Sequence, residues 1–258
     1  MNPDALLTIY LCVWLFVAGA VLGSFLDCAV WRWARGEAMF RGRSHCGSCG
    51  KTLSPRELVP VVSYLISRGK CRHCGADIPA ECLWAELAGG VGFVCFGVKF
   101  GLSLELAQWL ILGALLLAVA LTDAARQIIP DKLLLAMAAN RAVWLLVLRQ
   151  PLADTVKGML ISCIVPAALL AFVLLAEKFW KKEAMGGGDI KLLLALALYL
   201  SWPELLLTLL LGCVLGIVAA VAGRNRGPFP FGPSLAAAAV LAACFGAPLV
   251  DWYLGLLR

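Results

Sequence analysis

Long apolar segments dominate this sequence and restrict what it can fold into. A lipid-spanning helix needs about 20 mostly apolar residues, and the chain contains eight segments of this character. They are residues 5–27, 84–101, 104–122, 131–149, 155–176, 189–202, 204–222 and 234–257. Hydrophobic residues make up 62% of the chain and charged residues 15%, whereas soluble domains average roughly 45–50% and 25%. The sequence therefore predicts an all-α, polytopic membrane protein with about eight transmembrane helices.

Two of these segments need a specific interpretation. Residues 5–27 have no basic stretch before them and no small-x-small cleavage pattern after them, so they are expected to be a retained first span rather than a signal peptide. The segment 189–202 is short and follows a run of three glycines. We expect it to begin partway into the bilayer.

Lysine and arginine residues predict the orientation of the chain. The loop 28–83 contains Arg32, Arg35, Arg41, Arg43, Lys51, Arg56, Arg68, Lys70 and Arg72. Cytoplasmic loops of membrane proteins are enriched in such residues, so this loop is expected in the cytosol. Eight spans threaded from it place the ends of the segments that carry Asp123 and Asp189 on the cytosolic face as well. The net charge of +6 lies mostly in this one loop, and no nucleic-acid partner is expected.

The same loop contains a candidate metal site. Four of the eleven cysteines form two Cys-x-x-Cys pairs, Cys46 with Cys49 and Cys71 with Cys74. Two such pairs can complete a tetrahedral zinc site, and a cytosolic location disfavours disulfides. Without an open coordination position, the zinc would be structural. The neighbouring His45 and His73 are expected to be bystanders.

These features divide the chain into three parts. Residues 1–27 form the first transmembrane helix, residues 28–83 a small zinc-binding cytosolic domain, and residues 84–258 a seven-helix membrane domain. A domain of this size buries too little apolar surface for a large core, so a metal ion would supply part of its stability.

Asp123 and Asp189 are the candidate catalytic residues. Ionisable residues at lipid-spanning helices are costly and mark functional sites. Two neighbouring carboxylates can share one proton, so that one polarises a scissile carbonyl while the other activates a water. The glycines Gly186, Gly187 and Gly188 before Asp189 would let an extended peptide lie close to the backbone. The structural alternative is that Asp123 caps a short connection and that Asp189 is a helix N-cap.

Asp131 is a third acidic residue in this part of the chain. It follows Pro130, which interrupts the preceding helix, and it is expected to be the N-cap or first-turn acid of the next helix.

The ordered set of motifs resembles the type IV prepilin peptidases, the bacterial GxGD aspartyl proteases of the membrane. The resemblance rests on Asp123 followed by Ile129-Pro130-Asp131 and on Met185-Gly186-Gly187-Gly188-Asp189-Ile190-Lys191-Leu192. Gly23-Ser24-Phe25-Leu26, Arg68-Gly69-Lys70-Cys71 and Pro230-Phe231-Gly232-Pro233 occur in the family's order. The chain departs from the family pattern at Asp27, where asparagine is common, and at residues 80–84, whereas Glu86 agrees with it.

This resemblance implies a function and a location. Asp123 and Asp189 would be the catalytic pair of an enzyme in the bacterial inner membrane. It would cleave the leader peptide of type IV prepilins or pseudopilins at the cytosolic face and then methylate the new amino terminus with S-adenosylmethionine. The residues that bind this cofactor are not assigned, because the sequence contains no Rossmann-like glycine-rich turn. Its partners would be these substrates and membrane lipid.

Two other classes of function remain as alternatives. A transporter would use Asp123 and Asp189 to bind a cation, and a secretion or pilus scaffold would use the zinc domain and the helices without any chemistry. A presenilin-like intramembrane protease is closer in chemistry, but its Pro-Ala-Leu motif is absent.

Overall fold

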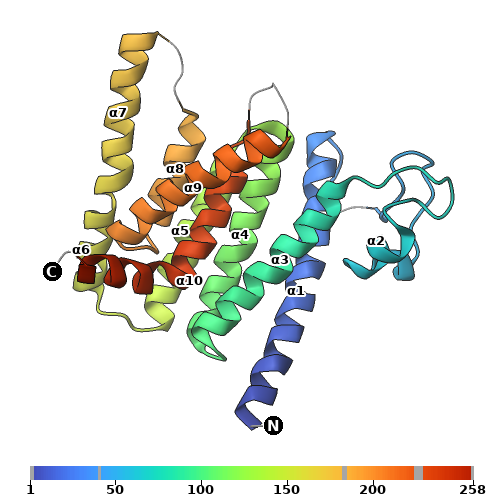
Figure 1. Ribbon diagram of the computed structural model, residues 1–258, viewed down its shortest axis with the longest axis horizontal. Helices are drawn as coiled ribbons and strands as arrows, with labels where there is room; N and C mark the ends of the chain where they lie inside the picture. The colour runs from blue at the N-terminus through green and yellow to red at the C-terminus, as the bar shows by residue number, and fades with distance from the viewer. Residues whose placement is uncertain (1–2, 40–41, 182–184, 224–228, 257–258) are drawn as a thin grey trace. The chain divides into compact units, whose positions relative to one another are not determined.

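The computed structural model describes residues 3–39, 42–181, 185–223 and 229–256. The chain divides into two compact units, Met1–Leu121 and Thr122–Arg258. Over the described residues the regular structure is helical, apart from two isolated β-bridges in the first unit (Figure 1). The predicted all-α class is therefore confirmed.

The first unit is built on two long helices in close contact, α1 (Pro3–Ala34) and α3 (Ala80–Phe100). Glycines make this contact possible. A methyl group at Gly19 would collide with the carbonyl oxygen of Gly89, and one at Gly23 with that of Ala85. Small residues let helix backbones approach closely, which is a common means of packing helices in membranes. The first unit also contains most of α4 (Leu104–Arg126), which extends across the boundary between the units.

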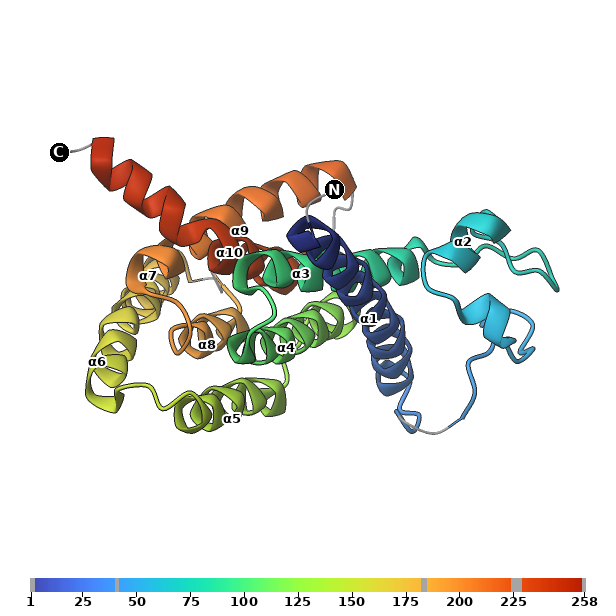
Figure 2. The same ribbon diagram turned by 90° about the horizontal axis from the view of Figure 1, so that it is seen from below.

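The polar loop between α1 and α3 folds into a small domain with little regular structure. It contains the 3-10 helix η1 (Pro55–Leu58) and the short helix α2 (Val62–Ser67). The β-bridges pair His45 with Thr52 and Lys70 with Asp77, so each encloses one Cys-x-x-Cys pair. Figure 2 shows this domain beside α1 and the first turns of α3, within the first unit.

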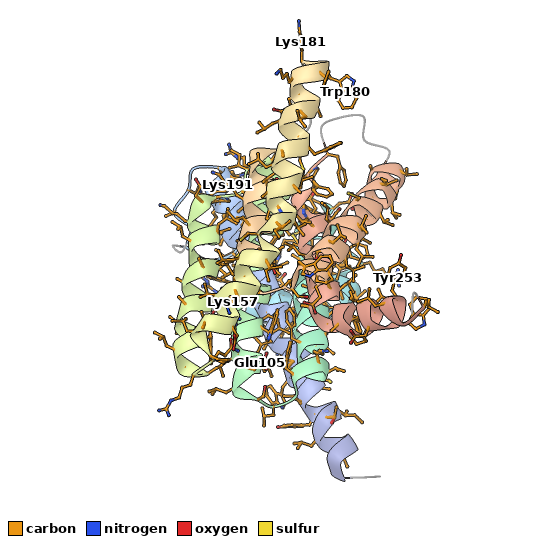
Figure 3. All side chains as sticks on the ribbon, turned by 90° about the vertical axis from the view of Figure 1, so that its left-hand side faces the viewer. Glu105, Lys157, Trp180, Lys181, Lys191 and Tyr253 are labelled. Carbon is orange, nitrogen blue, oxygen red and sulfur yellow. The ribbon has the colours of Figure 1, made fainter. Side chains whose placement is uncertain are left out.

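The second unit contains the end of α4 and the remaining helices. These are α5 (Asp131–Val147), α6 (Leu152–Ser162), α7 (Ile164–Trp180), α8 (Gly187–Leu196), α9 (Trp202–Gly223) and α10 (Gly232–Leu256). The last two pack tightly: a methyl group at Gly212 would lie 3.2 Å from the Leu235 side chain, and one at Gly216 would lie 3.4 Å from the Phe231 ring. Trp180 and Lys181 lie together at the C-terminal end of α7, where a polar environment suits them (Figure 3).

The expected count of eight spans is not confirmed. Six helical stretches in the described chain are long and apolar enough to cross a membrane: Leu6–Ala34, Ala80–Phe100, Leu104–Arg126, Leu152–Trp180, Trp202–Ala222 and Gly232–Leu256. Helix α8 has 10 residues and is about 15 Å long, half the roughly 30 Å of a hydrocarbon core. Helix α5, with 17 residues, is also short. The segments 131–149 and 189–202 are helical but do not qualify as full spans by length.

Helices α5 and α8 run side by side in the same direction. Near their first turns, the Lys191 Nζ lies 2.8 Å from the Asp131 carboxylate. One or two turns further on, the Tyr199 hydroxyl donates to the Met137 carbonyl at 2.6 Å and accepts from Asn140 Nδ2 at 2.9 Å. These contacts fix the direction and register of the short helix that carries Asp189.

Candidate active site and metal centre

Asp123 lies in the last turn of α4, and its side chain is only 6% exposed. Its Oδ2 accepts a hydrogen bond of 2.7 Å from the backbone N–H of Gly232, the first residue of α10. The first N–H groups of a helix have no partner within the helix, and they carry partial positive charge. The carboxylate of Asp123 therefore receives support from a helix that begins 109 residues later in the chain.

Gly232 is required at this contact for steric reasons. A Cβ there would lie 2.7 Å from Oδ2 of Asp123 and 2.9 Å from its Cγ. Real Cβ atoms do not approach a neighbour so closely, so any other residue would displace the carboxylate. The structural alternative, in which Asp123 caps a short connection, is not what the structure shows, because α4 continues to Arg126 and the carboxylate contacts α10 instead.

Asp189 lies in the first turn of α8, and its side chain is partly exposed. The N-cap of this helix is Gly186, and the Asp189 N–H donates to the Gly186 carbonyl at 3.1 Å. Asp189 is therefore not the N-cap that the structural alternative required. The helix also begins earlier than the sequence predicted, because Gly187 and Gly188 belong to its first turn.

The glycines before Asp189 make room for close contacts. A Cβ at Gly186 would lie 3.2 Å from Oδ2 of Asp189, and one at Gly188 would lie 3.3 Å from the Cβ of Ile129. Ile129 is buried and directly precedes Pro130 and Asp131. The two motif segments that are separate in the sequence, Ile129-Pro130-Asp131 and the glycine run, thus pack against each other.

The two aspartates interact electrostatically within the second unit. Burial, and after it the charge of Asp123, raise the pKa of Asp189 to about 6. Helix α8 is not one of the candidate spans, so Asp189 lies at the start of a short helix rather than inside a lipid-spanning one. A pair in which one acid holds its proton more tightly than an ordinary aspartate suits general acid–base chemistry.

Asp131 has a structural partner that the sequence did not reveal. It is the first residue of α5, and it forms an exposed ion pair with Lys191 of α8. The first-turn position is as predicted, but the N-cap of the helix is Pro130. Figure 3 labels Lys191 on α8.

The four loop cysteines meet at one point in the first unit. The Sγ atoms of Cys46, Cys49, Cys71 and Cys74 all lie within 4.8 Å of one another. A tetrahedral zinc site with Zn–S bonds of about 2.3 Å separates its sulfur atoms by roughly 3.8 Å, and the Cys46 and Cys74 sulfurs lie 3.9 Å apart. The donor set and its spacing fit a tetrahedral metal ion.

The two cysteine pairs have the same backbone geometry. The N–H of Cys46 donates to the Lys51 carbonyl, and the N–H of Cys71 donates to the Ala76 carbonyl. Gly50 and Gly75 close the turns with φ of 69° and 73°, a conformation that favours glycine. Backbone hydrogen bonds from Cys49 and Ser48 lower the pKa of Cys46 to about 6, which favours the thiolate that binds metal.

The neighbouring histidines contact other side chains. His73 Nε2 lies 3.4 Å from the Glu57 carboxylate, and His45 packs edge-on against the Trp31 ring. Neither belongs to the metal-competent cluster found in the described residues.

Comparison with known proteins connects both sites to one family. A model of the bacterial peptidase A24 N-terminal domain matches residues 17–100, which include the four cysteines, and the type IV leader peptidase family matches residues 110–221, which include both aspartates.

Curated relatives match most of the chain. A prepilin leader peptidase/N-methyltransferase of Bacillus subtilis is 34% identical over 247 residues, which are 93% of this chain and 96% of the relative. Proteins with the same name from Myxococcus xanthus and Pseudomonas aeruginosa are 34% and 33% identical over 84% and 82% of the chain, and over 65% and 74% of their own lengths. No solved structure matches. Two family models in the expected order and relatives of this extent identify the chain as a member of the type IV leader peptidase family.

Proposed function

We propose that this chain cleaves the leader peptides of type IV prepilins or pseudopilins, with Asp123 and Asp189 as its catalytic pair. The observation that carries the proposal is the arrangement of these two acids in one unit. Asp123 is buried against the first N–H of α10, and Asp189 lies at the start of α8 with its pKa raised by burial and by Asp123. The relatives named as prepilin leader peptidases support the substrate class.

We propose a separate role for each acid. Asp189, with the raised pKa, holds the shared proton and donates it toward the scissile carbonyl oxygen. Asp123, ionised and supported by the N–H of Gly232, accepts a proton from a water whose oxygen attacks the carbonyl carbon. The tetrahedral intermediate then breaks its C–N bond, and a proton passes to the leaving amine. Of the glycines before Asp189, Gly187 has open space around it, since a Cβ there would meet no atom within 4 Å, and it is the proposed point of approach of the substrate backbone.

We propose that cleavage is followed by a second activity, the N-methylation of the new amino terminus by S-adenosylmethionine. The name N-methyltransferase of the relatives supports it. The methyl donor supplies a carbon bound to a sulfonium. Once bound, it would supply its methyl group to the amine while the electrons of the S–C bond stayed on sulfur, and the amine would give up a proton to water.

The four-cysteine domain is proposed to hold one structural zinc ion. Cys46, Cys49, Cys71 and Cys74 would bind it with no position left for a substrate. The basic loop around them supports a cytosolic domain attached to the bacterial inner membrane, and the acid pair is proposed to lie at that same face. We keep residues 1–27, 28–83 and 84–258 as the proposed functional division.

The transporter and scaffold alternatives are not favoured, because neither accounts for membership in a peptidase family. The test of the proposal is cleavage of a purified prepilin by Asp123→Asn and Asp189→Asn in detergent. Each change should reduce the rate at least about 100-fold, since removing an acid–base group costs on the order of 10²–10⁴. The matched control is Asp154→Asn, an exposed residue in the first turn of α6. Normal cleavage by both single variants would refute the assignment.

A further inference from the structure

The short helix α2 and the residues before it carry apolar side chains on their outer surface. Val59, Val62, Leu65 and Ile66 form an apolar patch, in which Leu65 and Ile66 are 63% and 66% exposed. Residues three and four positions apart lie on one face of a helix, so the members on α2 are neighbours. A contiguous apolar surface of this kind marks a site of interaction. Neither the acid pair nor the metal explains it.

The opposite face of α2 is polar and points inward. Ser63, Tyr64 and Ser67 line a cavity of about 470 Å³ beside the four cysteines, and the Ser67 hydroxyl donates to the Tyr64 carbonyl at 3.2 Å. The helix is therefore amphipathic in the reverse of the usual sense for a domain in water, with polar side chains inside and apolar ones outside. This orientation suits an environment of lipid.

The level of α2 along the two long helices places the patch at the membrane. The N–H of Val61, the residue before α2, donates to the Glu86 carboxylate at 2.6 Å. Glu86 lies six residues after the start of α3, which is about 9 Å along the helix. Gly23 of α1 lies at the same level, since a methyl group there would be 3.1 Å from the Glu86 Cα. Both helices are candidate spans, so α2 begins level with residues inside them.

An exposed tryptophan marks the same level. Trp84 of α3 lies two residues before Glu86 and is 66% exposed. Tryptophan is enriched where lipid headgroups meet the acyl chains. Figure 1 shows α2 beside the long helices of the first unit and not beyond the end of α1. The start of α2 is therefore level with a membrane interface.

We propose that the apolar patch is inserted into the cytosolic leaflet of the membrane, where it contacts anionic phospholipid. Arg56 of η1 precedes most of the patch, and Arg68, the C-cap of α2, follows it, and both are exposed. Basic side chains beside an apolar surface bind anionic headgroups while the apolar residues enter the acyl boundary. The acidic residue of this segment, Glu57, already accepts hydrogen bonds from the Ser54 N–H and hydroxyl at 2.8 and 2.7 Å.

Insertion of the patch gives the four-cysteine domain a third attachment to the membrane, besides α1 and α3. Two helices alone would leave the loop between them free to tilt over the surface. The patch, bound to α3 through Val61 and Glu86, would hold the domain in one orientation against the bilayer.

The test uses a fluorescent amino acid in place of Leu65 in the purified full chain. The protein is reconstituted, one copy per disc, in lipid nanodiscs of phosphatidylethanolamine and phosphatidylglycerol, which leave both membrane faces open to solutes. Brominated acyl chains quench a probe that lies in lipid, and aqueous iodide quenches a probe that lies in water. The matched control carries the same probe in place of Thr52, an exposed residue of the same domain that is paired with His45.

The proposal predicts opposite results from the two quenchers. Brominated lipid should quench the probe at position 65 about 3-fold more than the probe at position 52, and iodide should quench it less by a similar factor. Equal quenching at the two positions would overturn the proposal. Protection from iodide without quenching by brominated lipid would also overturn it, because protein and not lipid would then cover the patch.

A substitution tests whether the apolar side chains cause the insertion. With the probe in place of Ile66, Leu65→Asp should lower quenching by brominated lipid about 3-fold, because a carboxylate resists transfer from water to lipid. Thr52→Asp with the same probe should leave the quenching unchanged. Quenching that Leu65→Asp does not alter would contradict the proposal. The comparison of positions 65 and 52 does not need this variant to fold, and neither measurement depends on cleavage or methyl transfer.

Discussion

The contact between Gly232 and Asp123 shows how one backbone group can position a carboxylate. The hydrogen bond of 2.7 Å and the absence of a side chain at Gly232 together fix the acid at the start of α10. Sequence analysis identified the Pro230-Phe231-Gly232-Pro233 motif but gave it no role. No pattern in the sequence could reveal that role, because 109 residues separate the two partners and only the tertiary structure brings them together.

Replacing Gly232 with alanine should therefore impair catalysis through geometry. The new methyl group would meet the Asp123 carboxylate at 2.7 Å, and a displacement of about 1 Å at a catalytic group can cost on the order of 100-fold in rate. We expect Gly232→Ala to insert normally and to cleave prepilin about 100-fold more slowly. Gly255→Ala is the control, since nothing lies within 4 Å of a Cβ at that position on the same helix. Equal rates for the two variants would show that the contact does not position the acid.

At the scale of elements, the short helix α8 determines where Asp189 lies. Lys191 binds Asp131 near its start, and Tyr199 binds Asn140 and Met137 beyond its end. Both contacts join α8 to α5, so the two helices share one register. The first turn of the helix contains Gly188, whose missing side chain lets the backbone lie close to Ile129.

The ion pair between Asp131 and Lys191 should contribute little to stability and should not be essential for chemistry. Both side chains are more than half exposed, and exposed pairs are worth about 0–1 kcal/mol. We expect Asp131→Asn to lower the cleavage rate less than about 5-fold. The exchanged pair Asp131→Lys with Lys191→Asp should recover part of any loss from Asp131→Lys alone. A loss as large as that of Asp189→Asn would instead make Asp131 part of the catalytic machinery.

The sequence predicted the elements better than their lengths. Each of the eight apolar segments contains a helix, although the segment 155–176 spans two helices, α6 and α7, and composition did not reveal η1 or α2. Gly19, Gly23, Gly89 and Gly90 explain how α1 and α3 pack. The predicted length of the helix in 189–202 was too great. The helix ends at Leu196 and is followed by turns through Tyr199, and hydrophobicity alone does not reveal that end. The sequence also did not reveal the hydrogen bonds of the buried Arg32 and Glu86. Their partners are backbone groups, the Gly42 carbonyl and the Val61 N–H, which no sequence pattern marks. The cysteine cluster, by contrast, followed directly from the spacing of its ligands.

The candidate metal site and the acid pair belong to different units. The four cysteines and the cavity beside them belong to the first unit, and both aspartates belong to the second. The metal should therefore matter more for methylation than for cleavage. This division follows from the position of the side chains and does not depend on how the units are arranged.

Removal of the metal is the prediction at this scale. Cys71→Ser should release zinc, because Cys71 is a buried member of the cluster and three remaining thiolates hold the ion less tightly. We expect methylation of the cleaved product to fall at least 10-fold, with a smaller loss of cleavage. Cys213→Ser, an exposed cysteine of α9 outside the cluster, is the control. Metal analysis that finds no zinc in the purified wild-type protein would remove the claim, and so would equal losses of both activities.

The most direct test of the acid pair is a double-mutant cycle on prepilin cleavage. Single-turnover rates are measured for the wild type, Asp123→Asn, Asp189→Asn and the double variant. When residues act as one catalytic unit, the effects of their substitutions on the rate are strongly non-additive. We expect the double variant to be no slower than either single variant. If the losses of the two single variants multiply in the double variant, or if either single variant cleaves at the wild-type rate, the two aspartates do not work as a pair.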